Sequence, residues 1–186
     1  MGSHLISWIV FLPLIGMLIM AFVPAGRGDR AIRSISLATS FIVFLLSTWL
    51  VVEFYRLPAP VRASFIGLSG AQFPAGASSL FETRAAWIPA FNVWYHVGVD
   101  GLSLILVFLT GLLSFLAVFA AWNIQKNVKG FHMMYMLLVT GMMGVFVALD
   151  LFLFYVFWEI MLLPMYFLIG IWGGPRKEYA AIKFFI

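Results

Sequence analysis

The sequence LFLFYVFWEIMLLPMYFLIGIW, residues 151–172, decides the fold of this chain, because it is long and apolar enough to cross a bilayer as one helix. It nevertheless contains a carboxyl group, Glu159, and a proline, Pro164. A charge at the centre of a membrane helix costs about 2.5–3.5 kcal/mol, whereas the thirteen Leu, Ile, Phe and Val residues of the stretch contribute on the order of 4–8 kcal/mol toward insertion. The stretch therefore inserts with its glutamate.

The composition extends this membrane interpretation to the whole chain. Of 186 residues, 64% are hydrophobic and 10% are charged, whereas a soluble domain has roughly 45–50% apolar and 25% charged residues. The eleven lysines and arginines are scattered between apolar runs, so the expected partner is the lipid bilayer and no nucleic acid is expected. The sequence has no cysteine, which excludes thiolate ligands for iron–sulfur clusters, and its three histidines lack the spacing of a metal site.

Five apolar runs reach the length of a membrane helix, so the sequence predicts an all-α, polytopic transmembrane helix bundle. The runs cover residues 5–23, 34–55, 101–122, 131–149 and 151–172. A sixth run begins near Tyr179 and reaches Ile186, where we expect a longer protein to continue it. The sequence divides the chain into helices 1–2 (1–56), an aromatic loop segment with an irregular or short hairpin-like cap (57–100), and helices 3–5 with the start of helix 6 (101–186).

The cations between the runs predict the orientation in the membrane. The loops after the first, third and fifth helices are positively charged, whereas the turn at Asp150 has no cation. The cations of these loops are Arg27, Arg30, Arg33, Lys126, Lys129, Arg176 and Lys177. Because positive loops stay in the cytoplasm, we expect the N-terminus and the segment 57–100 on the external side.

Helical spacing predicts a polar environment for Glu159. Tyr155 and Tyr166 fall on the same helix face, where their hydroxyl groups can order water or hydrogen-bond the carboxyl group. Pro164 has no N–H to donate to the carbonyl of Ile160, which leaves that carbonyl free for water. Two interpretations stay open: Glu159 belongs to a proton or ion path, or it is a protonated group whose hydrogen bond fixes helix packing.

Other polar residues have simpler explanations. Asp100 and Asp150 directly precede predicted helices, where N-capping accounts for them, although Asp150 is also the only charge on its side of two helices. Lys183 lies about one turn into the sixth helix, where a lysine can snorkel to the interface. We expect His132 at the membrane interface and His96 in a loop.

Three stretches resemble the antiporter-like membrane subunits of respiratory complex I. They are YHVGVDGLSL (95–104), DLFLFYVFWEIMLLPMYFLIGIWGG (150–174) and RKEYAAIKFFI (176–186). The resemblance implies a fold of about fourteen helices with two inverted repeats, of which this chain holds the first five helices and the start of the sixth. It also implies proton translocation in the bacterial inner membrane, driven by quinone reduction at a distant site.

The resemblance assigns roles to two residues. Glu159 matches a glutamate on helix 5 that pairs with a lysine on helix 7, and Lys183 matches a lysine early in helix 6, which favours a supporting role in the proton path over snorkelling. Further supporting residues are Tyr155, Tyr166, Pro164 and Asp150. NADH, flavin, iron–sulfur clusters and quinone are expected in the parent complex and no cofactor in this chain, and the expected partners are neighbouring antiporter-like subunits.

Two other interpretations remain open. The chain is the homologous subunit of a multi-subunit cation/proton antiporter or membrane hydrogenase, with the same glutamate and different partners. Alternatively, it is a non-conducting membrane scaffold in which Glu159 only holds helices together. Co-purification with a flavin- and iron–sulfur-containing peripheral arm selects complex I.

The predicted orientation is testable by thiol labelling, since the chain has no native cysteine. A cysteine at position 129 should be shielded from an impermeant thiol reagent in sealed cells and become labelled after the membrane is opened. Labelling at position 129 from the outside of sealed cells would overturn the orientation.

Overall fold

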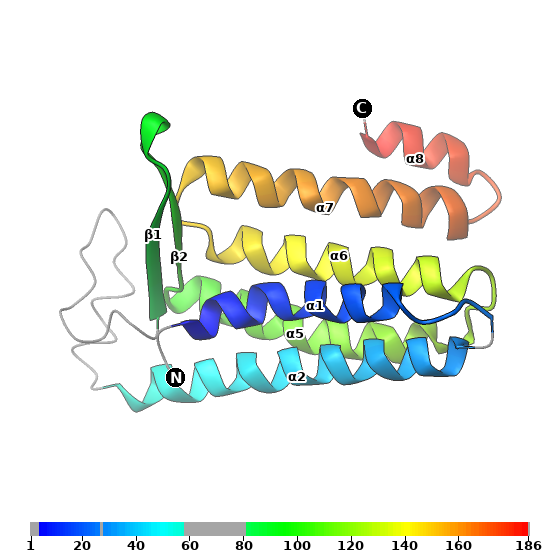
Figure 1. Ribbon diagram of the computed structural model, residues 1–186, viewed down its shortest axis with the longest axis horizontal. Coiled ribbons are helices and arrows are strands. Elements are labelled where there is room, and N and C mark those ends of the chain that lie inside the picture. The colour runs from blue at the N-terminus through cyan, green and yellow to red at the C-terminus, as the bar shows by residue number, and fades with distance from the viewer. Residues whose placement is uncertain (1–3, 27, 58–80, 186) are drawn as a thin grey trace.

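Five long helices lie side by side in the computed structural model, which describes residues 4–26, 28–57 and 81–185 (Figure 1). They are α1 (Leu5–Ala21), α2 (Asp29–Arg56), α5 (Gly101–Ala120), α6 (Val128–Val147) and α7 (Leu151–Trp172). A shorter helix, α8 (Lys177–Phe185), packs against α7 at the edge of the bundle. The described chain is thus the predicted polytopic helix bundle.

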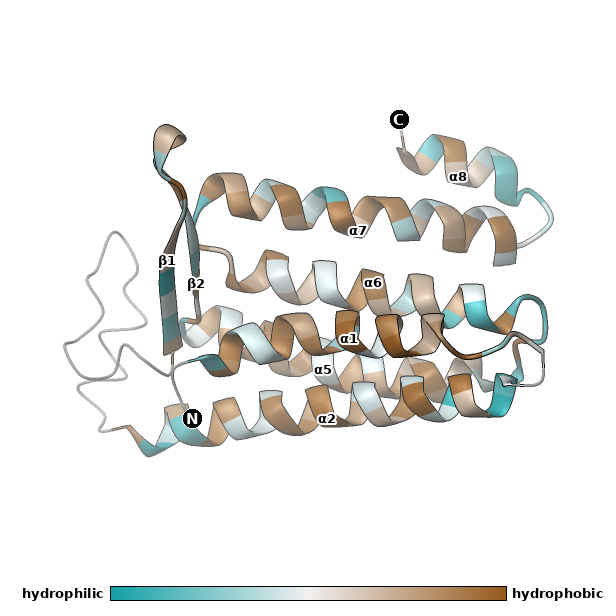
Figure 2. Cartoon of the chain, viewed as in Figure 1, coloured by the Kyte–Doolittle hydropathy of each residue, from teal (hydrophilic) through white to brown (hydrophobic). Residues whose placement is uncertain are grey.

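The helices have the length and composition of membrane spans. Four of those described are apolar enough to cross a bilayer: α2, α6, α7, and α5 together with the 3-10 turn η3 (Ala121–Asn123). The fifth, α1, has 17 residues and extends about 26 Å at 1.5 Å per residue, close to the thickness of the hydrocarbon layer. Figure 2 shows hydrophobic residues along the helix bodies and hydrophilic residues gathered at the helix ends and along the hairpin.

The helices begin and end close to the limits of the predicted apolar runs. The differences occur where a helix begins with a polar first turn. The run 151–172 is α7 without change. However, α2 begins at Asp29 and α6 at Val128, five and three residues before the apolar runs begin. Hydropathy locates the part of a helix that enters the lipid, whereas the backbone hydrogen bonds continue into the polar first turn.

Small residues bring α6 and α7 close together. A Cβ atom at Gly144 would collide with the ring of Phe157, and one at Gly141 would lie 2.9 Å from the Cβ of Met161. Small residues allow this approach between membrane helices, where close packing replaces the hydrophobic effect as the source of association.

An antiparallel hairpin covers one end of the bundle (Figure 1). Strand β1 (Glu82–Ile88) pairs with β2 (Val93–Gly98), and the short turn η2 (Pro89–Phe91) joins them. The expected hairpin-like cap is confirmed in this part of the loop segment, whereas residues 58–80 lie outside the described chain. The expectation for His96 was wrong: it lies in β2, where its Nε2 is 2.6 Å from Oε1 of Glu82.

The hairpin is fastened to the turn between α6 and α7 by backbone and side-chain bonds. The N–H of Leu149 donates to the carbonyl of His96 at 2.9 Å. Asp150 caps α7, since its Oδ1 accepts from the N–H groups of Phe152 and Leu153 at 2.9 and 3.2 Å. Its other oxygen, Oδ2, accepts from the N–H of Trp94 in β2 at 3.3 Å. One carboxylate thus joins the start of α7 to the hairpin.

These bonds also set the protonation of Asp150, which lies outside the membrane-spanning helices. Burial by itself raises the pKa of this carboxyl, but the N–H groups of Leu153, Trp94 and Phe152 outweigh it, with a contribution from His96, and the pKa is lowered. The capping predicted for Asp100 is confirmed as well: its side chain accepts from the N–H of Ser103 at the start of α5.

At the opposite end of the bundle, which we call the basic end, lysines bind the carbonyl groups where helices finish. Lys129 donates to the carbonyls of Ala21 and Val23 at 2.8 and 2.9 Å, after α1. Lys126 and Lys177 both donate to the carbonyl of Ile171 near the end of α7. Cations are favourable at helix C-termini, so these residues have a structural role in addition to any effect on orientation.

Replacing Asp150 with alanine should loosen both the start of α7 and the hairpin. Loss of an N-cap costs about 1 kcal/mol, or roughly fivefold faster hydrogen exchange at the two capped amides. Exchange measured by mass spectrometry should rise in peptides covering residues 149–153 and 93–98. The matched control is Asp100→Ala, which removes a cap that reaches no second element and should leave residues 93–98 unchanged.

The same carboxylate should give this region a sensitivity to acid. Because the pKa of Asp150 in the fold is lowered, its stabilising effect is present above the pKa of the unfolded chain and is lost as the pH falls through the folded value. After the rates are corrected for the intrinsic pH dependence of amide exchange, the protection of these peptides should therefore fall on acidification in the wild type. In Asp150→Asn this loss of protection should be absent, and equal losses in both proteins would contradict the role.

Candidate functional site

Glu159 lies on the side of α7 that faces away from the rest of the bundle. It is eight residues after Leu151, so it sits about 12 Å from the start of the helix. The inward side of α7 buries Leu153, Phe157 and Pro164. Glu159 is instead exposed on the surface of the described chain, and no hydrogen bond or ion pair joins it to any other described residue.

The residues around Glu159 form a stripe along the exposed side of α7. Spacings of three and four residues place them one above the other. The outer-stripe residues, as we call them, are Phe152, Tyr155, Glu159, Leu163 and Phe167, all of them exposed. A single carboxyl group thus lies in the middle of an apolar and aromatic surface.

The structure places Tyr155 in this stripe and Tyr166 beside it, but it bonds neither hydroxyl to the carboxyl group. Tyr155 lies one turn before Glu159 and is 61% exposed. The ring of Tyr166 contacts Phe185 of α8, with 5.6 Å between centroids. There it lines a groove of about 400 Å³ between α7 and α8, which also contains Leu163. Within the described chain, the predicted water-ordering role of both hydroxyls stays a prediction.

Pro164 lies inside α7 without ending it. The helix continues for two further turns to Trp172, and the proline side chain is buried. Its missing N–H leaves the carbonyl of Ile160, one residue after Glu159, without the usual helical donor. The sequence predicted that the carbonyl of Ile160 is a free hydrogen-bond acceptor next to Glu159. That prediction requires α7 to be one continuous helix, and it is.

Lys183 lies in the last turn of α8 and is exposed. Its Nζ is 5.9 Å from the centroid of the Tyr179 ring, a cation–π contact. It also borders a groove of about 560 Å³ beside the loop from α7 to α8. No ion pair joins Lys183 to Glu159. Counted along the two helices from the basic end, their positions differ by about 10 Å.

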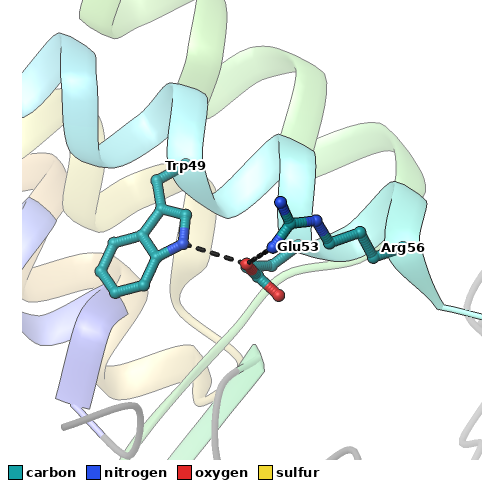
Figure 3. A network of polar contacts seen from close by, with 3 residues as sticks. All are labelled: Trp49, Glu53 and Arg56. Carbon is teal, nitrogen blue, oxygen red and sulfur yellow. Dashed lines mark hydrogen bonds and ion pairs between the residues drawn. The ribbon is translucent and has the colours of Figure 1, made fainter.

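Another carboxylate on a membrane-spanning helix, Glu53, provides a contrast (Figure 3). Its Oε1 accepts from Nη1 of Arg56 at 2.8 Å and from Nε1 of Trp49 at 3.1 Å, all within the last turns of α2. Glu53 is therefore paired inside its own helix near the hairpin end. Glu159 has no such partner in the part of the chain that the structure describes.

Sequence reasoning missed a group of buried and half-buried polar residues near the basic end. Its members, which we call the inner polar cluster, are Arg33 and Ser36 of α2, Ser114 of α5, and His132 and Tyr135 of α6. His132 was expected at the membrane interface; it lies about one turn into α6 at the basic end, but its side chain is 0% exposed and its Nδ1 lies 3.0 Å from Oγ of Ser36, a burial that the sequence did not predict. The available signal was the hydroxyl stripe of Ser36, Thr39, Ser40 and Ser47, which form much of the buried face of α2.

Comparisons of sequence agree with the arrangement of α7 and α8. Residues 148–186 match the family described as NADH:quinone oxidoreductase/Mrp antiporter, transmembrane. The chain is 38% identical to NADH-quinone oxidoreductase subunit M of Rhodobacter capsulatus, over 99% of the chain and 33% of the relative. It is also 38% identical to subunit M of Escherichia coli strain K12, over 98% of the chain and 34% of the relative. The chain thus spans about a third of the length of the curated relatives it matches.

Comparisons of structure support the fold. Respiratory complex I from Thermus thermophilus with bound NADH matches 95% of this chain and 31% of its own chain, with a TM-score of 0.69 and 23% identity. The membrane-bound sulfane sulfur reductase, an archaeal respiratory membrane complex, matches 98% of this chain and 33% of its own, with a TM-score of 0.67 and 18% identity. Both are multi-subunit membrane complexes, so the fold alone does not distinguish between them.

Proposed function

The chain belongs to the antiporter-like membrane subunits that include subunit M of NADH-quinone oxidoreductase, and from this premise we propose that it carries protons across the membrane as part of that complex. The observation that carries the proposal is the position of Glu159. It is an ionisable group within a membrane-spanning helix, exposed on an apolar stripe and without a partner in the described chain. Intramembrane ionisable residues commonly mark ion and proton paths, and they are costly unless another polar group pairs with them.

The outer stripe requires a cover. A carboxylate and several large apolar side chains on one helix face fit neither lipid nor water, so we propose that another helix of the longer protein lies against it. A cation on that helix would favour the ionised carboxylate when near and the protonated form when withdrawn. Such alternation lets Glu159 accept a proton and then release it.

Lys183 is proposed as a second positive charge along the same path. It lies closer to the basic end than Glu159, and the groove beside it is open between α7 and α8. Tyr155 and Tyr166 are proposed to order water along α7, together with the carbonyl of Ile160 freed by Pro164. Asp150 contributes by holding the start of α7 in place.

The proposed setting is the bacterial inner membrane, with the basic end in the cytoplasm and the N-terminus outside. Neighbouring antiporter-like subunits are the proposed protein partners. NADH, flavin, iron–sulfur clusters and quinone would belong to other parts of the complex, since this chain has no cysteine for cluster ligation.

A subunit of a cation/proton antiporter or a membrane hydrogenase is the second candidate function. The family description includes the Mrp antiporters, and the fold is shared with an archaeal respiratory complex. The names of the sequence relatives favour the quinone-reducing complex. Purification of the intact assembly decides between them, because a flavin- and iron–sulfur-containing arm should be present in one case only.

Glu159→Gln should abolish or severely lower proton pumping in a complex that still assembles, and it should slow coupled quinone reduction. Gln keeps the size and hydrogen bonding of the side chain but cannot take up and release a proton. The matched control is Glu53→Gln, which neutralises a carboxylate that is already paired within α2 and should leave pumping unchanged. A wild-type proton-to-electron ratio in assembled Glu159→Gln complex would exclude the proposal, and a scaffold role would then be favoured.

Lys183→Ala should reduce pumping without preventing assembly, because the proposed role depends on positive charge. Lys183→Arg should retain more activity than Lys183→Ala, since it keeps that charge. Coupled assays in sealed vesicles measure both. If the two variants pump like the wild type, Lys183 acts only as an anchor at the membrane surface.

A further inference from the structure

The inner polar cluster contains three buried polar atoms without a hydrogen-bond partner among the described residues. They are Nε of Arg33, Oγ of Ser114 and Nε2 of His132. Buried polar groups in proteins nearly always have a partner, either protein or ordered water. Three exceptions on three adjacent helices therefore point to one common cause.

The contacts within the cluster connect the residues of these atoms across the interfaces of α2, α5 and α6. His132 binds Ser36 across the interface of α6 and α2 at 3.0 Å. One turn further along α6, the hydroxyl of Tyr135 donates to the carbonyl of Ser114 on α5 at 2.8 Å. Arg33 lies close enough to His132 for an electrostatic interaction, and its Nη2 donates to the carbonyl of Ile124 at 2.9 Å.

The depths of these residues agree with this grouping. Counted at 1.5 Å per residue from the ends of their helices, Ser36, Ser114 and Tyr135 each lie about 10 Å from the basic end. Arg33 and His132 lie about 6 Å from it. Arg33 is half-buried, so its side chain connects the cluster to the surface of the bundle.

We propose that the inner polar cluster is a buried water-binding site, in which ordered water bonds the three unpartnered atoms, Nε of Arg33, Oγ of Ser114 and Nε2 of His132. The unpartnered atoms are enclosed by α2, α5 and α6, so neither a further helix nor a neighbouring subunit can reach them. A bound metal cation is disfavoured by the guanidinium of Arg33. Water fits, because it both donates and accepts, and buried waters typically bond polar groups that the protein leaves unpaired.

Such a site lies apart from the outer stripe and does not depend on the proposed transport function. Glu159 is on the far side of α7, whereas the cluster is formed by three other helices. An imidazole bonded to water at one nitrogen and to a hydroxyl group at the other is able to exchange a proton with its surroundings.

A cryo-EM map of the intact complex, at a resolution that shows ordered water, tests the site directly. Density for water is expected within about 3.2 Å of Nε2 of His132. In the Ser114→Ala complex this density should weaken or disappear, whereas in the Ser40→Ala control it should remain. Ser40 is the matched control because its buried hydroxyl bonds only carbonyls of α2. A dry contact at Nε2, in a map that resolves other buried waters, overturns the proposal.

The midpoint temperature of thermal unfolding of the assembled complex tests the site in a second way. Removing the Ser114 hydroxyl should shift this temperature in opposite directions, depending on whether the hydroxyl binds water or has no partner. If Ser114 binds water, Ser114→Ala should lower the midpoint by at least as much as Ser40→Ala. If its hydroxyl is buried without any partner, removing it relieves an unfavourable burial and should raise the midpoint. A raised midpoint in Ser114→Ala overturns the water site, while the outcome for Glu159→Gln leaves it unaffected.

Discussion

The structure depends on one constraint: lipid offers no hydrogen bonds, so polar groups inside a bilayer must find their partners within the bundle, either protein groups or bound water. Most buried hydroxyl groups of this bundle satisfy this constraint by a hydrogen bond within their own helix. Ser40, Ser47, Thr110 and Thr140 each donate to a carbonyl three or four residues earlier in the same helix. Such residues are polar in sequence but add little polarity to the interior, which explains how α2 can bury a face rich in serine and threonine.

The two ends of the bundle meet the same constraint differently. At the hairpin end, Asp150 and the backbone bond from Leu149 to His96 connect the start of α7 to a pair of strands. At the basic end, lysine side chains bind the last carbonyls of α1 and α7. The helices are therefore fixed at both ends, and the cations that indicate orientation in sequence also stabilise helix ends in the fold.

The sequence predicted those features of the fold that depend on the transfer of side chains from water to lipid. Helix number, the limits of α7, and the capping roles of Asp100 and Asp150 follow from apolar runs and from the residues that precede them. What it did not predict depends on how helices rotate toward one another. His132 was expected at the membrane interface because it lies near a helix start, but the sequence did not predict that α6 turns it toward Ser36 of α2. A sequence pattern indicates how deep a residue lies in the membrane, but it does not indicate which residue of another helix it contacts.

The same distinction separates the two polar regions. The inner polar cluster is enclosed by three packed helices, so its groups have fixed neighbours and only small molecules can exchange there. Glu159 lies instead at the edge of the described bundle, where the identity and distance of its partner depend on another element. The proposed role requires Glu159 to alternate between two protonation states. An edge position suits that role, because a charged neighbour that moves away by a few ångströms changes the interaction of the two charges by about 2 kcal/mol at an effective dielectric constant of about 20. A carboxylate held inside α2, as Glu53 is by Arg56 and Trp49, has no such freedom. The position of Glu159, on a face without a partner among the described residues, therefore favours it over Glu53 for the proposed coupling.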